Sequence, residues 1–293
     1  MIASVNRNAL IRFIAALLTV AASVVPARAD NVQVTYSSAG QTGPDIAALC
    51  AGATVCDYGM ENFSAWTGSR TFVSKFNDAG TGTFNTPSGA SFTGTYAAGP
   101  GTTTGYGGEW IKQAQNIYGG VSGAYPELFG PPAVGAGSGT ASYTLSLTSI
   151  GVPGINYFGL WISALDPYNN LTVYDGSNLI AQFDSATLLA QLGTCPGSDY
   201  CGNPTAAQQG ADSGELFAFV NIFDLTGFIT KVIFSNNGSS GFESANHTVA
   251  YIDPVHALGT PVNTLAVPEP GAVAVFGVAL VSLGMLRHRR PTR

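Results

Sequence analysis

The chain has 293 residues, of which 45% are hydrophobic and only 10% are charged, and its formal net charge is −6. This length allows one large domain or two small ones beside short terminal segments. An acidic, weakly charged chain has no long-range attraction for nucleic acid or anionic lipid, which excludes both classes of electrostatic binder.

The N-terminal residues 1–29 have the pattern of a secretory signal peptide. Two arginines accompany an apolar run over residues 13–25, and a small-x-small cleavage site follows at residues 27–29. We therefore expect export through the Sec translocon and a mature chain that starts at Asp30. The alternative is an uncleaved N-terminal anchor, for which this apolar run is short.

The body of the chain, residues 30–266, is more acidic than the whole. It contains four basic and sixteen acidic residues, which gives a net charge of −12. Gly, Thr, Ser, Tyr and Phe are abundant, and long helix-forming side chains are few. This composition favours an all-β extracellular domain that does not bind nucleic acid.

The first half of the body predicts short strands at residues 32–36, 70–76 and 91–96, separated by turn residues. Residues 99–108 are rich in Gly and Thr and predict a loop. The Pro/Gly/Ala-rich stretch near residues 130–140 indicates a long turn or an internal domain boundary, and both interpretations stay open.

The second half of the body is more regular. Alternating or continuous apolar patterns predict strands at residues 142–148, 155–163, 171–174, 179–183, 216–223, 228–235 and 248–252. Residues 175–178 predict a hairpin turn, and residues 184–192 a short helix capped by Asp184 or Ser185. Together these elements predict a jelly-roll-like β-sandwich over residues 30–253, followed by a Pro-containing linker at residues 254–266.

The four cysteines form two local pairs, with five residues between the members of each pair. They are Cys50, Cys56, Cys195 and Cys201. An exported chain reaches an oxidising compartment, where cysteines form disulfides. The spacing favours Cys50–Cys56 and Cys195–Cys201, although three pairings are open in principle. A metal site is the alternative, but CxxC spacing is missing and no histidine is near.

The sequence requires no cofactor, but it contains oxygen-rich residues that would suit Ca²⁺. The candidate ligands around the predicted hairpin are Asp166, Asn169, Asn170 and Asp175. The alternative is that they only form turns by bonding their own backbone. A second candidate site joins Glu61, Glu243 and Asp253, since the first and last strands of a sandwich often meet.

Extracellular polysaccharide is a candidate ligand, because exposed aromatic rings offer flat apolar platforms to sugar rings. Trp110, which follows the Gly/Thr loop beside Glu109 and Lys112, is the candidate ligand-binding residue. Trp161 lies within a predicted apolar strand, so we expect it to be buried.

We assign no catalytic residues. The sequence contains no HExxH, GxSxG, P-loop or GxGxxG match. A hydrolase would need His247 or His256 to meet a serine and a carboxylate in space. His247 follows an asparagine and is predicted to be a solvated turn residue.

The C-terminal residues 267–293 combine a short motif, one apolar run and a basic end. These are Val267-Pro268-Glu269-Pro270, residues 271–286, and Arg287, Arg289 and Arg290. The prolines keep the motif extended. The apolar run predicts a single transmembrane helix of about 24 Å, which flanking residues would extend to a ~30 Å hydrocarbon core. The positive end predicts a cytoplasmic tail.

This C-terminal arrangement resembles the PEP-CTERM sorting signal. The resemblance implies that an exosortase, an integral-membrane cysteine protease, cuts the chain near Pro268-Glu269-Pro270. It also implies a transient anchor in the inner membrane of a Gram-negative bacterium, then release to the cell surface or the extracellular polysaccharide matrix. The alternative is a permanent single-span anchor.

Parts of the body also resemble exosortase-dependent surface proteins. These are residues 158–161, residues 166–176, and Phe242-Glu243-Ser244-Ala245-Asn246. The late motif of that family reads Phe-Glu-x-Asp-Asn, so Ala245 departs from it. The resemblance implies a β-sandwich, surface display and no catalysis. We therefore expect a structural or adhesive role, with a carbohydrate- or calcium-binding module as the alternative and a hydrolase after that.

Overall fold

The computed structural model describes residues 31–262, apart from residues 68, 70, 79–81, 100–109, 122, 124, 129–140 and 239 and the side chains of residues 110–112. Residues Asp30–Ala266 form one compact unit. The predicted signal peptide, the sorting signal with its transmembrane helix, and the stretch near residues 130–140 lie outside the described residues. Among the residues that are described, no helix is both long and apolar enough to span a membrane.

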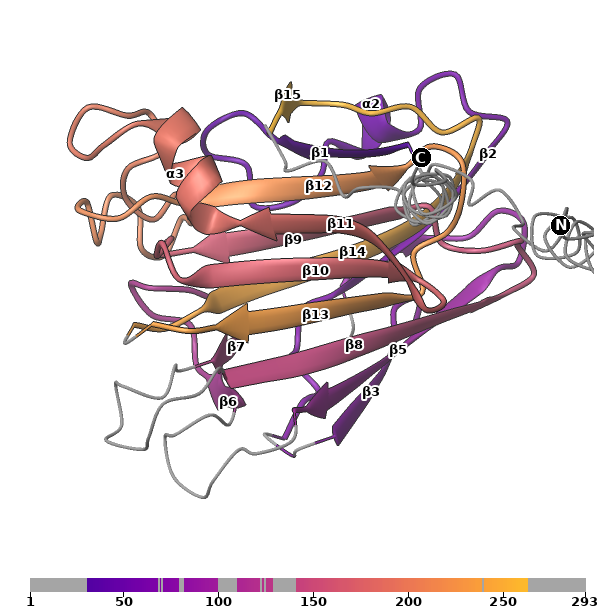
Figure 1. The fold of residues 1–293 in the computed structure, drawn as a ribbon, viewed down its shortest axis with the longest axis horizontal. Helices are drawn as coiled ribbons and strands as arrows, with labels where there is room; N and C mark the ends of the chain where they lie inside the picture. Colours follow the sequence, from indigo (N-terminus) through magenta and orange to yellow (C-terminus); the bar gives the residue numbers. More distant parts are fainter. Residues whose placement is uncertain are drawn as a thin grey trace, which may run out of the picture. The chain divides into compact units, whose positions relative to one another are not determined.

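The described strands form two antiparallel sheets (Figure 1). The larger sheet runs in the order β15 (Thr260–Pro261), β1 (Val32–Tyr36), β12 (Ala218–Asp224), β9 (Tyr157–Ser163), β14 (Glu243–Asp253), β2 (Val55–Glu61) and β4 (Phe84–Asn85). Strand β7 (Tyr125–Leu128) pairs with β14, and β6 (Trp110–Gln113) pairs with β7. The smaller sheet runs in the order β11 (Asn178–Asp184), β10 (Asn169–Asp175), β13 (Lys231–Asn236), β8 (Ala141–Ile150), β5 (Ser91–Ala98) and β3 (Thr71–Lys75).

Two short helices accompany the sheets. Helix α2 (Ile46–Leu49) begins after Asp45, whose carboxylate accepts a hydrogen bond from the Ala48 N–H. Helix α3 (Ser185–Leu192) begins after Asp184 in the same way and ends at Gly193, which has a φ of 92°. A side-chain acceptor at the start and a glycine with positive φ at the end are the expected helix limits, so the helix predicted at residues 184–192 is confirmed.

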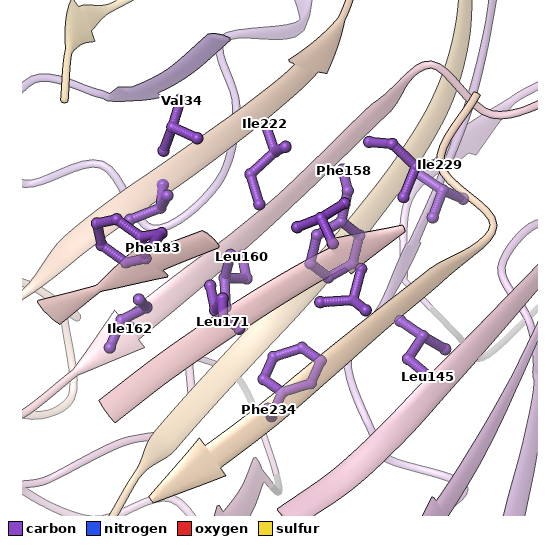
Figure 2. Close-up of a cluster of buried hydrophobic side chains, with 14 of the residues drawn as sticks. Val34, Leu145, Phe158, Leu160, Ile162, Leu171, Phe183, Ile222, Ile229 and Phe234 are labelled. Carbon is purple, nitrogen blue, oxygen red and sulfur yellow. The ribbon is translucent and has the colours of Figure 1, made fainter. Parts of the chain in front are cut away.

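One hydrophobic cluster lies between the two sheets (Figure 2). Phe158 and Leu160 of β9 come from the larger sheet, and Leu171 of β10 and Phe234 of β13 come from the smaller one. The Phe158 and Phe234 rings meet edge to face, with centroids 6.2 Å apart. Burial of apolar surface of this kind is the main stabilising contribution to the fold.

The larger sheet is covered on its outer face as well. Near one end of its central strands, α2 and the segment after β14 contribute to a cluster around Tyr157 and Phe223. Elsewhere on this face, Tyr125 packs with Trp161 in a second cluster. Every residue of β9 and β12 is therefore buried, whereas β8, β10 and β13 of the smaller sheet alternate between buried and more exposed residues.

Most of the predicted strands are present, with shifted ends. The strand predicted at residues 248–252 is longer, because β14 already begins at Glu243. Strand β2 lies in a segment for which we predicted no strand. The predicted linker at residues 254–266 is wrong in its first part, because residues Thr260–Pro261 pair with β1 and Val255 packs against the outer cluster of Tyr157.

Both predicted disulfides are present. Cys50–Cys56 and Cys195–Cys201 each close a short loop. The described residues contain no free cysteine. Disulfides form and persist in oxidising compartments, so they indicate an extracellular or periplasmic environment.

The two ends of the described chain meet at one edge of the larger sheet. Tyr36 of β1 lies opposite Thr260 of β15, and the Val262 N–H donates to the Val34 carbonyl at 2.8 Å. The folded body therefore begins and ends on neighbouring strands (Figure 1).

Candidate functional site

The four residues predicted to bind calcium at the hairpin do not lie together. Asn169 starts β10 and Asp175 ends it, six residue steps or about 20 Å away. Asp166 lies just before β10, and Asn170 donates to the Tyr168 carbonyl at 2.9 Å, as a turn residue does. The hairpin thus separates Asp166 and Asp175 instead of joining them.

The second predicted set is also dispersed. Glu243 and Asp253 are the first and last residues of the eleven-residue β14. Glu61 lies opposite His247, nearer the middle of that strand, and is fully buried. Its carboxylate accepts hydrogen bonds from the Ser74 hydroxyl and the Phe63 N–H.

Trp110 is the first residue of β6, and its side chain lies outside the described part of the structure. Trp161 is fully buried, as predicted, and stacks on Phe217 with centroids 5.8 Å apart.

The structure brings together two glutamates that the sequence did not connect. Glu127 of β7 and Glu243 of β14 lie directly opposite each other on neighbouring strands. The next pair, Leu128 and Phe242, exchanges both backbone hydrogen bonds. In an antiparallel ladder the adjacent pair is then a non-hydrogen-bonded pair, which brings the two side chains closest. The exposed fractions of Glu127 and Glu243 are only 7% and 5%.

Both glutamates lie on the outer face of the larger sheet. Their neighbours Leu128 and Phe242 belong to the cluster between the sheets, and side chains alternate between faces along a strand. Ser163 of β9 lies opposite Glu243 on its other side. Ser163, Glu243 and Glu127 therefore form one row across three neighbouring strands, which we call the carboxylate row.

Buried oxygen atoms of the carboxylate row are without hydrogen-bond partners. They are the hydroxyl oxygen of Ser163 and Oε2 of Glu243. The Oε1 atoms of the two glutamates converge: a β-carbon on Gly241 would lie 2.1 Å from that of Glu243 and 3.0 Å from that of Glu127. The row thus brings one oxygen atom of each glutamate to the same point beside Gly241.

Further carboxyl groups lie near the row. Burial raises the pKa of Glu243 well above its ordinary value, and Glu127 and then Asp166 raise it further. Burial also raises the pKa of Asp166, which interacts with Asp212 in turn. The pKa of Glu215 is raised by partial burial and then by Asp166 and Asp212. The row is therefore the most buried part of a larger acidic group.

A second buried polar cluster lies between the sheets, and we call it the histidine network. His247 Nδ1 is 3.0 Å from the Tyr96 hydroxyl, and Nε2 is 3.0 Å from the Ser244 hydroxyl. Ser244 is in turn 3.1 Å from the hydroxyl of Tyr143. The prediction that His247 is a solvated turn residue is wrong, because its side chain is fully buried among aromatic rings.

A β-bulge in β14 assembles the histidine network. The pairing with β9 is regular at Ala245 and resumes at Thr248, with one more residue on β14 than on β9 between these points. Asn246 is this extra residue, and its φ is 48°. Residues three apart face opposite sides of a regular strand, so the bulge is what turns both Ser244 and His247 inward.

The histidine network does not have the geometry of a hydrolytic triad. His247 meets a serine, but its other nitrogen faces the Tyr96 hydroxyl instead of a carboxylate. Burial lowers the pKa of His247 to about 3, which keeps the ring neutral. The network can therefore satisfy buried polar groups and tie β14 to the facing sheet through Tyr96 and Tyr143.

Within the described residues, no group of three or more His, Cys, Asp or Glu side chains has the arrangement of a metal centre. The carboxylate row holds two such side chains, and its other oxygen comes from a serine. Its chemistry is that of hard oxygen donors, which favour divalent cations such as Ca²⁺ over softer metals.

Neither cluster could be predicted from the local pattern of residues. Glu243, Ser244 and His247 lie in a polar stretch without the alternation that predicts a strand, so their common strand was not expected. Glu127 follows Pro126 in a segment for which no element was predicted. Two signals pointed to Glu243, namely its place in the motif that begins at Phe242 and its place in the second predicted calcium site.

Comparison with models of known protein families finds no match to this chain. Comparison with curated protein sequences likewise finds no similar protein.

Proposed function

We propose that the chain is an exported protein of the cell surface or extracellular matrix, with a structural or adhesive and non-enzymatic role. The observation that carries this proposal is the pair of disulfides in an all-β body whose sequence is flanked by two targeting patterns. Disulfides need an oxidising compartment, and a signal peptide delivers the chain to one.

The sorting route rests on the resemblance of residues 267–293 to the PEP-CTERM signal. On this route the chain is held briefly in the inner membrane by residues 271–286 and is released when an exosortase cuts near Pro268-Glu269-Pro270. For the body we propose a jelly-roll-like β-sandwich, and two antiparallel sheets with a common hydrophobic cluster support this fold.

The test is the intact mass and cell fraction of the protein from its native host. We expect a released species that starts at Asp30 and ends near Pro268. Replacement of Arg287, Arg289 and Arg290 by alanine should leave a longer species in the inner membrane, because the positive end fixes the topology. Replacement by lysine keeps the charge and is the matched control. A full-length C-terminus in the inner membrane of the unaltered host contradicts the sorting route.

A ligand-binding module is the second candidate. The carboxylate row favours a cation over a carbohydrate, because it collects carboxylate and hydroxyl oxygen atoms.

A further inference from the structure

The carboxylate row places two acidic side chains directly opposite each other in a buried position, an arrangement that protein folds ordinarily avoid. Directly opposed like charges destabilise a strand pair, and buried charges are stable only when they are paired or coordinate a metal. A shared proton can join the two carboxyl groups. When both are ionised that donor is gone, and Oε2 of Glu243 is a buried acceptor without a partner.

The described cationic side chains lie elsewhere. Lys75 is 3.9 Å from Asp78, and Lys231 lies over the Tyr174 ring at 3.8 Å from its centroid. Among the groups that act on the pKa values of Glu127 and Glu243, the described ones are carboxyl groups and neutral hydrogen-bonding groups. Among the described side chains, none therefore supplies a positive charge to the row.

The unpartnered oxygen atoms point to the chemical class of a ligand. Ser163 is fully buried and its hydroxyl has no partner, although it stands beside Glu243 in the row. A water molecule could bond this hydroxyl but would leave the charges unopposed. A cation of high charge satisfies the carboxylates and accepts the hydroxyl oxygen as a neutral ligand.

We propose that Glu127, Glu243 and Ser163 bind one divalent cation of the calcium class on the outer face of the larger sheet. The cation bridges β7 and β14 where these two strands pair, and it holds the β6–β7 hairpin against the sheet. This inference specifies the ligand of the second candidate function and is independent of the sorting route.

Terbium luminescence and thermal unfolding test the site on the full-length chain in detergent. Terbium substitutes for calcium and is excited through nearby tyrosine, and Tyr125 lies two residues from Glu127 on the same strand face. We expect saturable terbium emission that calcium displaces. Calcium at a hundredfold excess over its dissociation constant should raise the Tm by about 5–10 °C.

The variants E243Q and E127Q each remove one charge with little change of shape. Both should lose the terbium signal and the calcium-dependent shift of Tm, while their Tm without calcium stays at or above that of the parent protein. E61Q is the matched control, because Glu61 is also a buried glutamate on the larger sheet, and D78N controls for an exposed carboxylate. Both controls should keep the full calcium response.

Two results would overturn the proposal. One is the absence of terbium emission and of any Tm shift in the unaltered protein at millimolar calcium, which would leave a proton-sharing pair. The other is an equal response in E243Q, E127Q and the parent protein, which would place the cation elsewhere. Neither result bears on export, which is read from the mass and cell fraction of the protein.

Discussion

At the scale of single residues, His247 shows how burial sets the behaviour of an ionisable group. Its ring touches Phe63 and Phe234 and is satisfied by two hydroxyl groups, so the neutral form is favoured. The pKa falls from 6.5 to about 3. The stability of the folded state thus depends on pH through a fully buried side chain.

The sign of this coupling follows from the lowered pKa. Between pH 6.5 and 3 this histidine is protonated in the unfolded chain but stays neutral in the folded chain. The free energy of unfolding therefore falls as the pH is lowered through this range. The loss attributable to His247 should be on the order of 4 kcal/mol from pH 7 to pH 3. The variant H247F, which cannot titrate, should be less stable than the parent at pH 7 and should lack this part of the acid sensitivity.

Urea unfolding of the parent, H247F and Y96F at several pH values measures this effect. Y96F is the matched control, because it removes the hydroxyl that meets His247 but keeps the imidazole. It should lower stability by about 1–3 kcal/mol and retain the acid sensitivity. Parallel pH curves for the parent and H247F would contradict the assignment.

At the scale of elements, the bulge in β14 decides which side chains reach the core. Asn246 adopts a left-handed conformation at the bulge and donates to the Thr42 carbonyl at 2.7 Å. Asparagine tolerates this conformation better than most residues, and glycine tolerates it best. The bulge therefore depends both on the backbone preference of Asn246 and on its side-chain hydrogen bond.

Replacement of Asn246 separates these two contributions. N246G loses the hydrogen bond but adopts the left-handed region freely, so it should lower the free energy of unfolding by about 0.5–1.5 kcal/mol. N246A loses the same hydrogen bond and keeps a β-carbon in the left-handed region without the polar side chain that helps asparagine to tolerate it, which adds about 1 kcal/mol. Chemical unfolding should rank the parent above N246G and N246G above N246A. An N246A variant as stable as N246G would show that the bulge is not under this constraint.

Comparison of β14 with β8 and β9 shows which strands can be predicted from the sequence and which cannot. Residues 142–148 and 155–163 carry apolar patterns that reflect burial on one or both faces, and the strands are there. The segment from Glu243 to His247 has no such pattern, because four of its five buried side chains are polar. Those of Ser244 and His247 meet hydroxyl groups of the facing sheet. The pairing of Glu127 with Glu243 depends on long-range register, which no local pattern encodes.

At the scale of the whole molecule, the two halves of the chain are interleaved. Strands before residue 129 pair with strands after residue 140 in both sheets, as β2 does with β14 and β5 with β8. A contact network of this kind makes folding cooperative over the whole body and gives many contacts between residues distant in sequence.

Division of the body at residue 135 tests this interdependence. Neither residues 30–135 nor residues 136–266 should unfold cooperatively alone, because each would expose half of the hydrophobic cluster and unpaired strand edges. Circular dichroism and thermal unfolding of each half and of their mixture provide the measurement. A half that melts with a sharp transition of its own would instead indicate an independent domain.

On the proposed route, the pairing of β15 with β1 sets the length of chain left between the folded body and the transmembrane helix. Only residues 263–270 separate the edge of the sheet from the start of the proposed transmembrane helix. Eight residues span at most about 29 Å when fully extended. On the proposed route, a protease that cuts near Pro268 must therefore work close beneath the folded body. Release then depends on the access of the protease to this short segment. A bulky partner bound near β15 would block that access.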